Sequence, residues 1–354
     1  MQTSSAYFRD GGFYESSIPF LLAEGSGDFD PERIGLEGDY LQFESSVAVD
    51  SIDAPRVAAL IDVEHAADGL QAAKTELHFV VLDETLTGVT VDVIIAQNPG
   101  TSLDGINAEL RGTSGPVAIV ATEDSSGELR TRTTKGYNTE TGAELWSVSG
   151  EAKVSASDVV VVADVGEEPK RCQQVSGIKA STGEVLWSVD ETVQASLGGK
   201  SCSSISVETG WASTRYVPIH LGYGPGTVLF DLQSGASLAP PDGRQFHSQW
   251  LEDAATGDIY FPTDGEGSKA TVYDPATGAT RFSLPYAEVR ALEFEAEALF
   301  GGKLYGSNSE GKIIVDVATA SSQVSAWDAH GVAVLGPWVL YSDGLLRSDV
   351  PLSG

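Results

Sequence analysis

Hydrophobic and polar positions alternate through much of the chain, in short runs that are separated by turn residues. The run Glu144–Val148 is typical, because its polar and apolar residues take turns along the sequence. A period of two places the apolar side chains on one face, as in a half-buried β-strand. The runs are bounded by Gly and polar residues, and helical periodicity is scarce. The pattern therefore predicts an all-β chain.

One short phrase recurs between these runs about every forty residues. Tyr137–Trp146 is answered by Ile178–Trp187 and then by three looser copies. The last turn position of each copy follows the one before by 41, 52, 43 and 42 residues. Periods of this size with strand-like flanks are typical of four-stranded propeller blades. The five turn positions are Gly142, Gly183, Gly235, Gly278 and Ala320.

Each phrase has the chemistry of a hairpin turn. A short polar residue such as Asn138 can bond the backbone two residues on, and Gly supplies the positive φ that closes the turn. In a propeller this hairpin joins the two outer strands of a blade, so we expect the bulky Trp146 and Trp187 to pack between blades. Two copies depart from the pattern, with Lys179 in place of Asp or Asn and Ala320 in place of Gly. We expect those two turns to be looser or of another type.

A second set of strand signals lies upstream of each turn and completes a count of four strands per blade. These segments are short, rich in β-forming residues and bounded by Gly or acidic residues, so we expect them to be inner strands. They are Val117–Ala121, Val159–Ala163, Asp258–Phe261 and Gly302–Gly306.

The first hundred residues fit the pattern poorly. A degenerate turn is expected at Asp83–Gly88 and a weaker one near Asp50–Pro55, which brings the number of turns to seven. The strand around Ala6–Phe8 could close the ring beside the final strands Gly331–Tyr341. We therefore predict one β-propeller domain over residues 1–354, with degenerate blades and ring closure in 1–110 and the clear repeats in 111–345. Seven blades are expected, with eight as the alternative.

Charge narrows the classes of partner. The chain carries 51 acidic and 21 basic residues, a formal net charge of −30. Such a field repels phosphate backbones, so nucleic-acid binding is not expected. It would attract a cationic peptide, a polyamine or a metal ion, although a plainly solvated acidic surface is the favoured interpretation. No run approaches the roughly 18 apolar residues of a membrane helix, so we expect a soluble monomer without a transmembrane segment.

The chain has two cysteines, Cys172 and Cys202. They suit one disulfide between neighbouring blades, worth roughly 3 kcal/mol where the geometry permits, and a disulfide implies an oxidising compartment. Two unrelated reduced thiols are the alternative. Residues 1–20 lack the basic start and apolar core of a secretory signal.

The turn phrase Asn138–Trp146, with its second copy at Gly183–Trp187, resembles the pyrroloquinoline-quinone-like propeller repeat, in which a Trp follows Asp-x-x-x-Gly. The match covers about five copies within residues 115–325. That superfamily includes quinone-dependent alcohol dehydrogenases, the propeller lipoprotein of the outer-membrane assembly machinery and many exported bacterial proteins.

The dehydrogenase branch of that superfamily stacks its quinone on a disulfide between adjacent cysteines and binds calcium. Here the cysteines are not adjacent and no calcium triad can be matched, so no cofactor and no metal site are expected. The resemblance instead implies a non-catalytic propeller, secreted or in the cell envelope, that serves as a protein-binding or scaffold module. The alternative is a carbohydrate-active propeller enzyme, a glycosidase or lyase, with carboxylates facing the channel.

Two polar-aromatic clusters are candidate binding sites, since Arg and Trp are typical of interaction hot spots. The first follows Pro240-Pro241, and buried contacts between blades are an equal alternative for it. The second lies in the longest repeat, where extra length is typical of a binding loop. The first comprises Arg244, His247 and Trp250, and the second comprises Trp211, Tyr216, His220 and Tyr223.

Overall fold

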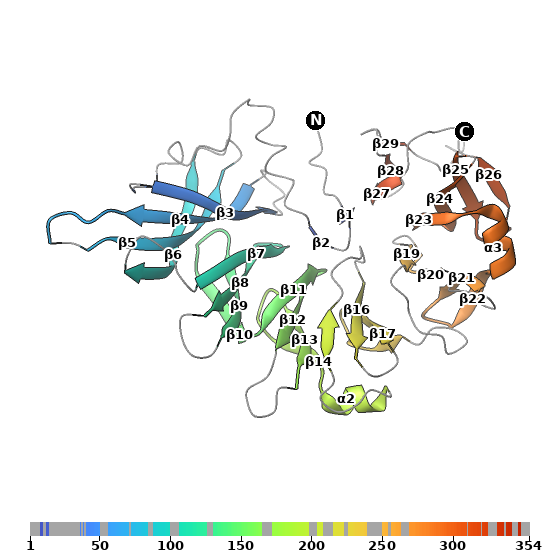
Figure 1. The fold of residues 1–354 in the computed structure, drawn as a ribbon, viewed down its shortest axis with the longest axis horizontal. Helices are drawn as coiled ribbons and strands as arrows, with labels where there is room; N and C mark the ends of the chain where they lie inside the picture. Colours follow the sequence, from blue (N-terminus) through green and yellow to red (C-terminus); the bar gives the residue numbers. More distant parts are fainter. Residues whose placement is uncertain are drawn as a thin grey trace. The chain divides into compact units, whose positions relative to one another are not determined.

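The computed structural model of the chain is built almost wholly of antiparallel β-strands (Figure 1). It divides into two compact units, one formed mainly by residues 13–195 and the other mainly by residues 196–354. Residues 232–235 belong to the first unit and residues 7–12 to the second. The structure describes residues 8–9, 12–13, 36, 38, 40–49, 56–70, 72–83, 88–99, 106–125, 130–164, 172–197, 204–207, 215–222, 226–238, 250–253, 256–262, 269–309, 311–319, 321–324, 331–335, 338–341 and 346–347.

The first unit holds three four-stranded sheets, each made of four consecutive strands. In Figure 1 they follow one another from blue to green. The first sheet contains β3 (Tyr40–Val49), β4 (Arg56–His65), β5 (Lys74–Leu82) and β6 (Val89–Pro99). The second contains β7 (Ile106–Ser114), β8 (Val117–Asp124), β9 (Thr131–Asn138) and β10 (Glu144–Ser149). The third contains β11 (Glu151–Ala156), β12 (Val159–Asp164), β13 (Gln174–Lys179) and β14 (Val185–Val189), after which comes the short helix α2 (Glu191–Ser196).

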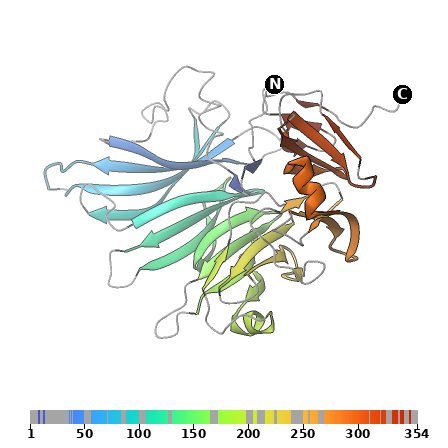
Figure 2. The same cartoon turned by 45° about the vertical axis from the view of Figure 1, so that its right-hand side comes forward.

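The second unit continues the same meander, and helix α3 lies beside β21 and β22 (Figure 2). Its first four-stranded sheet contains β15 (Ile205–Val207), β16 (Tyr216–Leu221), β17 (Gly226–Asp231) and β18 (Ser237–Leu238). The next contains β19 (Leu251–Glu252), β20 (Ile259–Phe261), β21 (Lys269–Asp274) and β22 (Ala279–Pro285), followed by α3 (Tyr286–Leu292). The third contains β23 (Glu295–Phe300), β24 (Lys303–Asn308), β25 (Gly311–Asp316) and β26 (Ser322–Val324). Last come the three strands β27 (Gly331–Leu335), β28 (Trp338–Tyr341) and β29 (Leu346–Arg347), and the two-stranded pair β1 (Phe8–Arg9) and β2 (Gly12–Phe13).

The predicted fold class, an all-β chain of four-stranded propeller blades, is confirmed by this strand order. The four expected inner segments are β8, β12, β20 and β24, each the second strand of its sheet. Among the described residues β1 lies close to β27, in the region where ring closure was expected. The blade number and the single-domain organisation remain predictions.

The two turns expected in the first hundred residues do not mark two separate blades. The connection near Asp50–Pro55, itself outside the described residues, joins β3 to β4, and the turn at Asp83–Gly88 joins β5 to β6 of the same sheet. The two turns therefore belong to one blade rather than two. The prediction of two blades was wrong because the four strands of this sheet are longer than those of the clear repeats, so one blade covers more of the sequence.

The turn at Lys179 is not looser than the others. The backbone N–H of Gly183 donates to the carbonyl of Lys179 at 2.8 Å, and Gly142 donates to Asn138 at the same distance. The two glycines have φ values of 74° and 73°. Lys179 cannot accept from the N–H two residues on, as Asn138 does from Glu140, but Asp158 of the neighbouring hairpin accepts from the equivalent Ser181 N–H at 3.1 Å. The expectation for Lys179 was wrong for this reason, and Ala320 lies outside the described residues.

The two tryptophans pack between successive sheets, as the sequence predicts. Trp146 is buried against the turn glycine of the next sheet, where a Cβ on Gly183 would come within 2.5 Å of the Trp146 Cβ. Trp187 meets Gly235 in the same way. In the first sheet Val91 and Val93 occupy the equivalent place against Gly142. A recurrent contact between a large side chain and a glycine turn thus stabilises the first unit, to which the turn of residues 232–235 also belongs.

Candidate functional site

The first sheet reaches farther than the other sheets of its unit. Its strands are 9 to 11 residues long, whereas β11 to β14 have 5 or 6 residues. At about 3.3 Å per residue, a ten-residue strand spans roughly 33 Å. Its far end carries the loop between β4 and β5, which projects at the left of Figure 1. We name residues 66–73 the tip loop.

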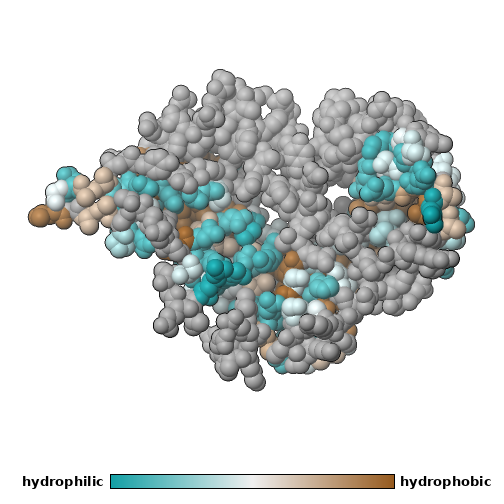
Figure 3. Space-filling model, viewed as in Figure 1, coloured by the Kyte–Doolittle hydropathy of each residue, from teal (hydrophilic) through white to brown (hydrophobic). Residues whose placement is uncertain are grey.

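The tip loop presents apolar side chains to solvent. Leu70 is fully exposed, and Ala66, Ala67 and Ala72 are exposed beside it. Gly69 has a φ of 57° and provides the turn. The end of the loop is brown in Figure 3, at the extreme of the first sheet. Covering such a side chain with another protein would remove apolar surface from water, so Leu70 is a candidate contact residue.

An ionic cluster holds the base of the tip loop. Glu76 is buried and accepts from Lys74 Nζ at 2.7 Å, while His65 Nε2 lies 2.9 Å from its other oxygen. Burial opposes ionisation of Glu76, but the bonds and charges of Lys74 and His65 outweigh it and lower the pKa. His78 Nδ1 lies 2.6 Å from Asp92 Oδ1 on β6. We name these five residues the neck cluster, which ties β4, β5 and β6 together beneath the loop.

A pair of carboxyl groups lies on β3 and β4 of the same sheet. Burial, followed by the charges of Glu44 and Glu64, raises the pKa of Asp62 to about 6. Asp62 shares a hydrogen bond with Glu44, and its buried Oδ1 has no partner among the residues that the structure describes. Structural pairs of carboxyl groups also shift pKa values, so the raised pKa of Asp62 does not by itself assign this pair to the carbohydrate-active alternative, which remains a prediction.

A second charged network joins the second and third sheets. Glu151 on β11 accepts from Lys153 at 2.6 Å, from Arg111 on β7 at 3.0 Å and from Arg132 on β9 at 3.1 Å. Burial opposes ionisation of Glu151, yet the hydrogen bond from Lys153 and the three positive charges lower its pKa. Each cation is already engaged by a carboxylate, so we interpret this Glu151 network as a link between sheets rather than a ligand site.

The structure brings together one residue from each aromatic cluster that the sequence singled out. Trp250 and Tyr216 are both buried in one apolar core of the second unit, with Tyr273 and Phe261, whose rings stack at 5.1 Å. Within the part of the chain that the structure describes, the indole Nε1 of Trp250 and the hydroxyl of Tyr273 have no hydrogen-bond partner. Burial raises the pKa of Tyr216 to about 12, so it stays a neutral phenol. Neither Trp250 nor Tyr216 offers its side chain to solvent, and a binding role for them remains a prediction.

The other residues of those clusters are placed only in part. His220 on β16 is exposed, and its Nδ1 lies 3.4 Å from Thr227 Oγ1. Cys172 is disulfide-bonded, while Cys202, the other cysteine of the chain, lies outside the described residues, so their pairing remains a prediction. Also outside the described residues are Arg244, His247, Trp211 and Tyr223.

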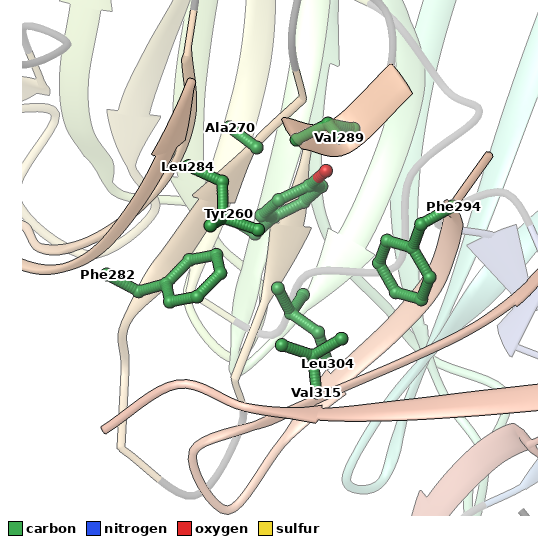
Figure 4. A pocket seen from close by; sticks show the side chains of 8 residues that line it. All are labelled: Tyr260, Ala270, Phe282, Leu284, Val289, Phe294, Leu304 and Val315. Atoms are coloured by element: carbon green, nitrogen blue, oxygen red, sulfur yellow. The ribbon is translucent and has the colours of Figure 1, made fainter. Parts of the chain in front are cut away.

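A small cavity lies in the second unit between the sheet β19–β22, the sheet β23–β26 and α3. Its volume is about 10 Å³, and its walls are apolar side chains that point toward one another (Figure 4). Tyr260, Phe282 and Leu304 form much of the lining. The space holds no more than about one water molecule and offers it no polar partner, so it is a packing defect rather than a ligand pocket.

Within the described residues, no group of three His, Cys, Asp or Glu side chains is arranged to hold a metal ion. The helices of the described part of the chain are too short and too polar to cross a membrane.

Comparisons with known proteins give structural likeness alone. No family model matches the chain, and no curated protein matches it. Among solved structures, BamB from Moraxella catarrhalis is 12% identical over 87% of this chain and 96% of its own, with a TM-score of 0.36. A quinohemoprotein alcohol dehydrogenase from Comamonas testosteroni is 9% identical over 92% and 73%, with a TM-score of 0.34. A chain of the mitotic checkpoint complex is 10% identical over 91% and 94%, with a TM-score of 0.37.

The two kinds of protein that the repeat phrase resembles, the outer-membrane assembly lipoprotein and the quinone-dependent dehydrogenases, are thus among the structures that the chain is similar to. With TM-scores of 0.37 or less, these likenesses assign neither a family nor a function.

The tip loop and the neck cluster are the features that sequence reasoning missed. Asp68-Gly69 is a strong hairpin signal, and it lies between Ala-Ala pairs that are too small to form a core. A leucine directly after such a turn is expected to point into solvent. That signal was available, but it falls outside the repeat phrase.

Proposed function

We propose that the chain is a non-catalytic propeller that binds another protein through its tip loop. One observation carries this proposal, the full exposure of Leu70 at the end of the longest sheet. A partner that covers an exposed apolar side chain removes its surface from water, which favours binding. Leu70 is suited to that role because the small neighbours Ala67 and Ala72 leave its side chain accessible from several directions.

The neck cluster supports the proposal by fixing the direction of the loop. Binding through a rigid element loses less conformational entropy than binding through a free loop. The bonds from Lys74 and His65 to buried Glu76 join the two strands directly below the tip. We infer that they present Leu70 in a single orientation.

We further propose that the protein is exported, either secreted or held in the cell envelope. The support is the disulfide state of Cys172, since disulfides persist in oxidising compartments. Cys202 is the partner that we expect, because the sequence holds two cysteines.

The test compares capture by the intact chain and by a variant of the tip. The immobilised protein is incubated with a native envelope and secretion extract, and the bound proteins are identified by mass spectrometry. We expect a protein that the wild type and Ile94→Ser retain and that Leu70→Ser loses. Ile94 is the matched control because it is an exposed aliphatic residue on β6 of the same sheet. Equal capture by Leu70→Ser, or no captured protein, would contradict the proposal.

A further inference from the structure

Three exposed aliphatic residues lie at the outer edge of the first unit, away from the tip loop. Leu145 on β10 is 43% exposed, and Val185 and Leu186 on β14 are 55% and 37% exposed. β10 and β14 are the outermost strands of the second and third sheets. Trp146 directly follows Leu145, and Gly183 lies two residues before Val185. Because Trp146 packs on Gly183, the two strands approach each other at these positions. We name Leu145, Val185 and Leu186 the rim patch.

A β-bulge turns each leucine outward. On β10, Glu144 pairs with Tyr137 and Trp146 with Gly136, which leaves Leu145 as the extra residue. On β14 the residues paired with Ile178 and Gly177 are Val185 and Trp187, so Leu186 is extra. A bulge redirects the side chain and weakens the edge as a template for another strand. The rim patch is therefore suited to contact through side chains rather than strand addition.

The fold does not require an apolar residue at these bulges. In the second unit the same bulge precedes Phe282 on β22, and there the extra residue is Arg281. Its exposed side chain pairs with Asp274 at 3.0 Å. A charged residue thus occupies the position that Leu145 and Leu186 hold in the first unit. Since packing does not explain the two leucines, a contact outside the chain is the better explanation.

Charge around the rim patch defines the partner. Glu144 and Glu184 directly precede Leu145 and Val185 and are exposed, and Glu140 is exposed in the preceding turn. Two cations lie on the same hairpins: Lys135 is paired with Glu144, and Lys179 donates its backbone N–H to the carbonyl of Glu184. These carboxylates, on a chain of net charge −30, oppose a second copy of the chain and an anionic lipid surface. They favour a segment in which Lys or Arg flanks aliphatic side chains.

We propose that the rim patch is a docking surface for a basic amphipathic helix of a partner protein. The helix lays its aliphatic stripe on Leu145, Val185 and Leu186, and its flanking Lys or Arg side chains meet Glu144 and Glu184. This mode needs no free strand edge, in keeping with the bulges. It goes beyond the proposed function because it concerns a second surface, which does not depend on Leu70.

The test uses a synthetic amphipathic helix of Leu and Lys as the probe and the methyl NMR signals of the Leu and Val residues as the readout. We expect titration to shift the signals of Leu145, Val185 and Leu186, while that of buried Val80 stays in place. The same helix with Glu in place of each Lys should cause no shift. The double variant Leu145→Arg with Leu186→Arg should bind the Leu and Lys helix at least about tenfold more weakly, which corresponds to about 1.4 kcal/mol.

A control of equal charge separates docking from general electrostatic attraction. Ile94→Arg with Gln97→Arg adds the same two charges at exposed positions of β6 and should leave the affinity near that of the wild type. Equal weakening by both double variants, or shifts spread over the whole surface, would overturn the proposal. Two other results would do the same, namely binding of anionic lipid vesicles that the rim variant abolishes, or self-association that it abolishes.

Discussion

The indole Nε1–H of Trp146 donates a hydrogen bond of 2.6 Å to the backbone carbonyl of Ala180 in the neighbouring sheet. Trp187 repeats this relationship with Leu232 at 2.7 Å. In both cases the acceptor lies three residues before the turn glycine, which packs on the indole ring. One side chain therefore fills the space between two sheets and satisfies a carbonyl of the turn.

Removing the indole N–H should separate the hydrogen bond from the packing. Trp146→Phe keeps a ring but loses the donor, whereas Trp250→Phe loses a donor that has no partner among the described residues. We expect Trp146→Phe to lower the free energy of unfolding by about 1–2 kcal/mol more than Trp250→Phe. Urea unfolding followed by circular dichroism measures the difference. An equal loss in the two variants would mean that the bond to Ala180 contributes nothing.

The glycine beneath the indole should tolerate no side chain. Gly183 has a φ of 74°, and an added Cβ would lie 2.5 Å from the Trp146 Cβ. Gly69 in the tip loop is the matched control, because its φ is 57° and no atom of the described residues lies within 4 Å of such a Cβ. We expect Gly69→Ala to cost about 1–2 kcal/mol, the cost of the left-handed backbone alone, and Gly183→Ala to cost clearly more. Thermal unfolding compares the two, and equal losses would contradict the packing described for Trp146.

Neutralising Asp62 should stabilise the protein at neutral pH. The folded pKa of about 6 lies above the usual value of 3.8 for an aspartate, so ionisation as the pH rises from about 4 to 6 disfavours the folded state. Above pH 6 Asp62 is ionised in the folded state as well, and the loss of stability reaches its full size. We expect Asp62→Asn to raise the free energy of unfolding at pH 7.5 by about 1–2 kcal/mol, after allowance for solvent screening, and to have less effect at pH 4. Denaturation at the two pH values tests this, with exposed Asp68→Asn as the control. A loss of stability at pH 7.5 would be the contrary result.

The Glu151 network should give the opposite dependence on pH. Because the folded pKa of Glu151 is lowered, its contribution is present above the unfolded value of 4.5 and is lost as the pH falls through the folded value. We expect Glu151→Gln to cost about 1–2 kcal/mol at pH 7 and less in acid, since the side chain is partly exposed. Glu144→Gln, which breaks the exposed pair with Lys135, should cost no more than about 0.5 kcal/mol. If both variants lost the same free energy of unfolding at pH 7, the Glu151 network would contribute no more than an exposed ion pair.

The fold could be predicted from sequence where local chemistry and packing agree. Asn138 and Gly142 specify their turn by themselves, and the bulky Trp146 after it has one suitable place to go. The turn at Lys179 could not be predicted, because its missing bond is supplied by Asp158 from another hairpin. Such compensation depends on contacts between strands that the local sequence does not reveal.

The candidate surfaces were harder to predict for a related reason. Aromatic residues such as Trp250 and Tyr216 have the composition of a hot spot, yet the fold buries them in a core. Leu145 and Leu186 look like ordinary strand residues in the sequence, and Leu70 follows a hairpin signal that lies outside the repeat phrase. A hairpin tip and two bulges expose them, and exposure of that kind depends on register.

Site-specific photo-crosslinking in the native host tests the proposed binding role most directly. A benzophenone side chain replaces Leu70 in one strain and Ile94 in another, and the cells are irradiated before extraction. A discrete crosslinked protein at position 70, absent at position 94, is the expected result. No adduct at position 70, or the same adducts at both positions, would contradict binding through the tip loop.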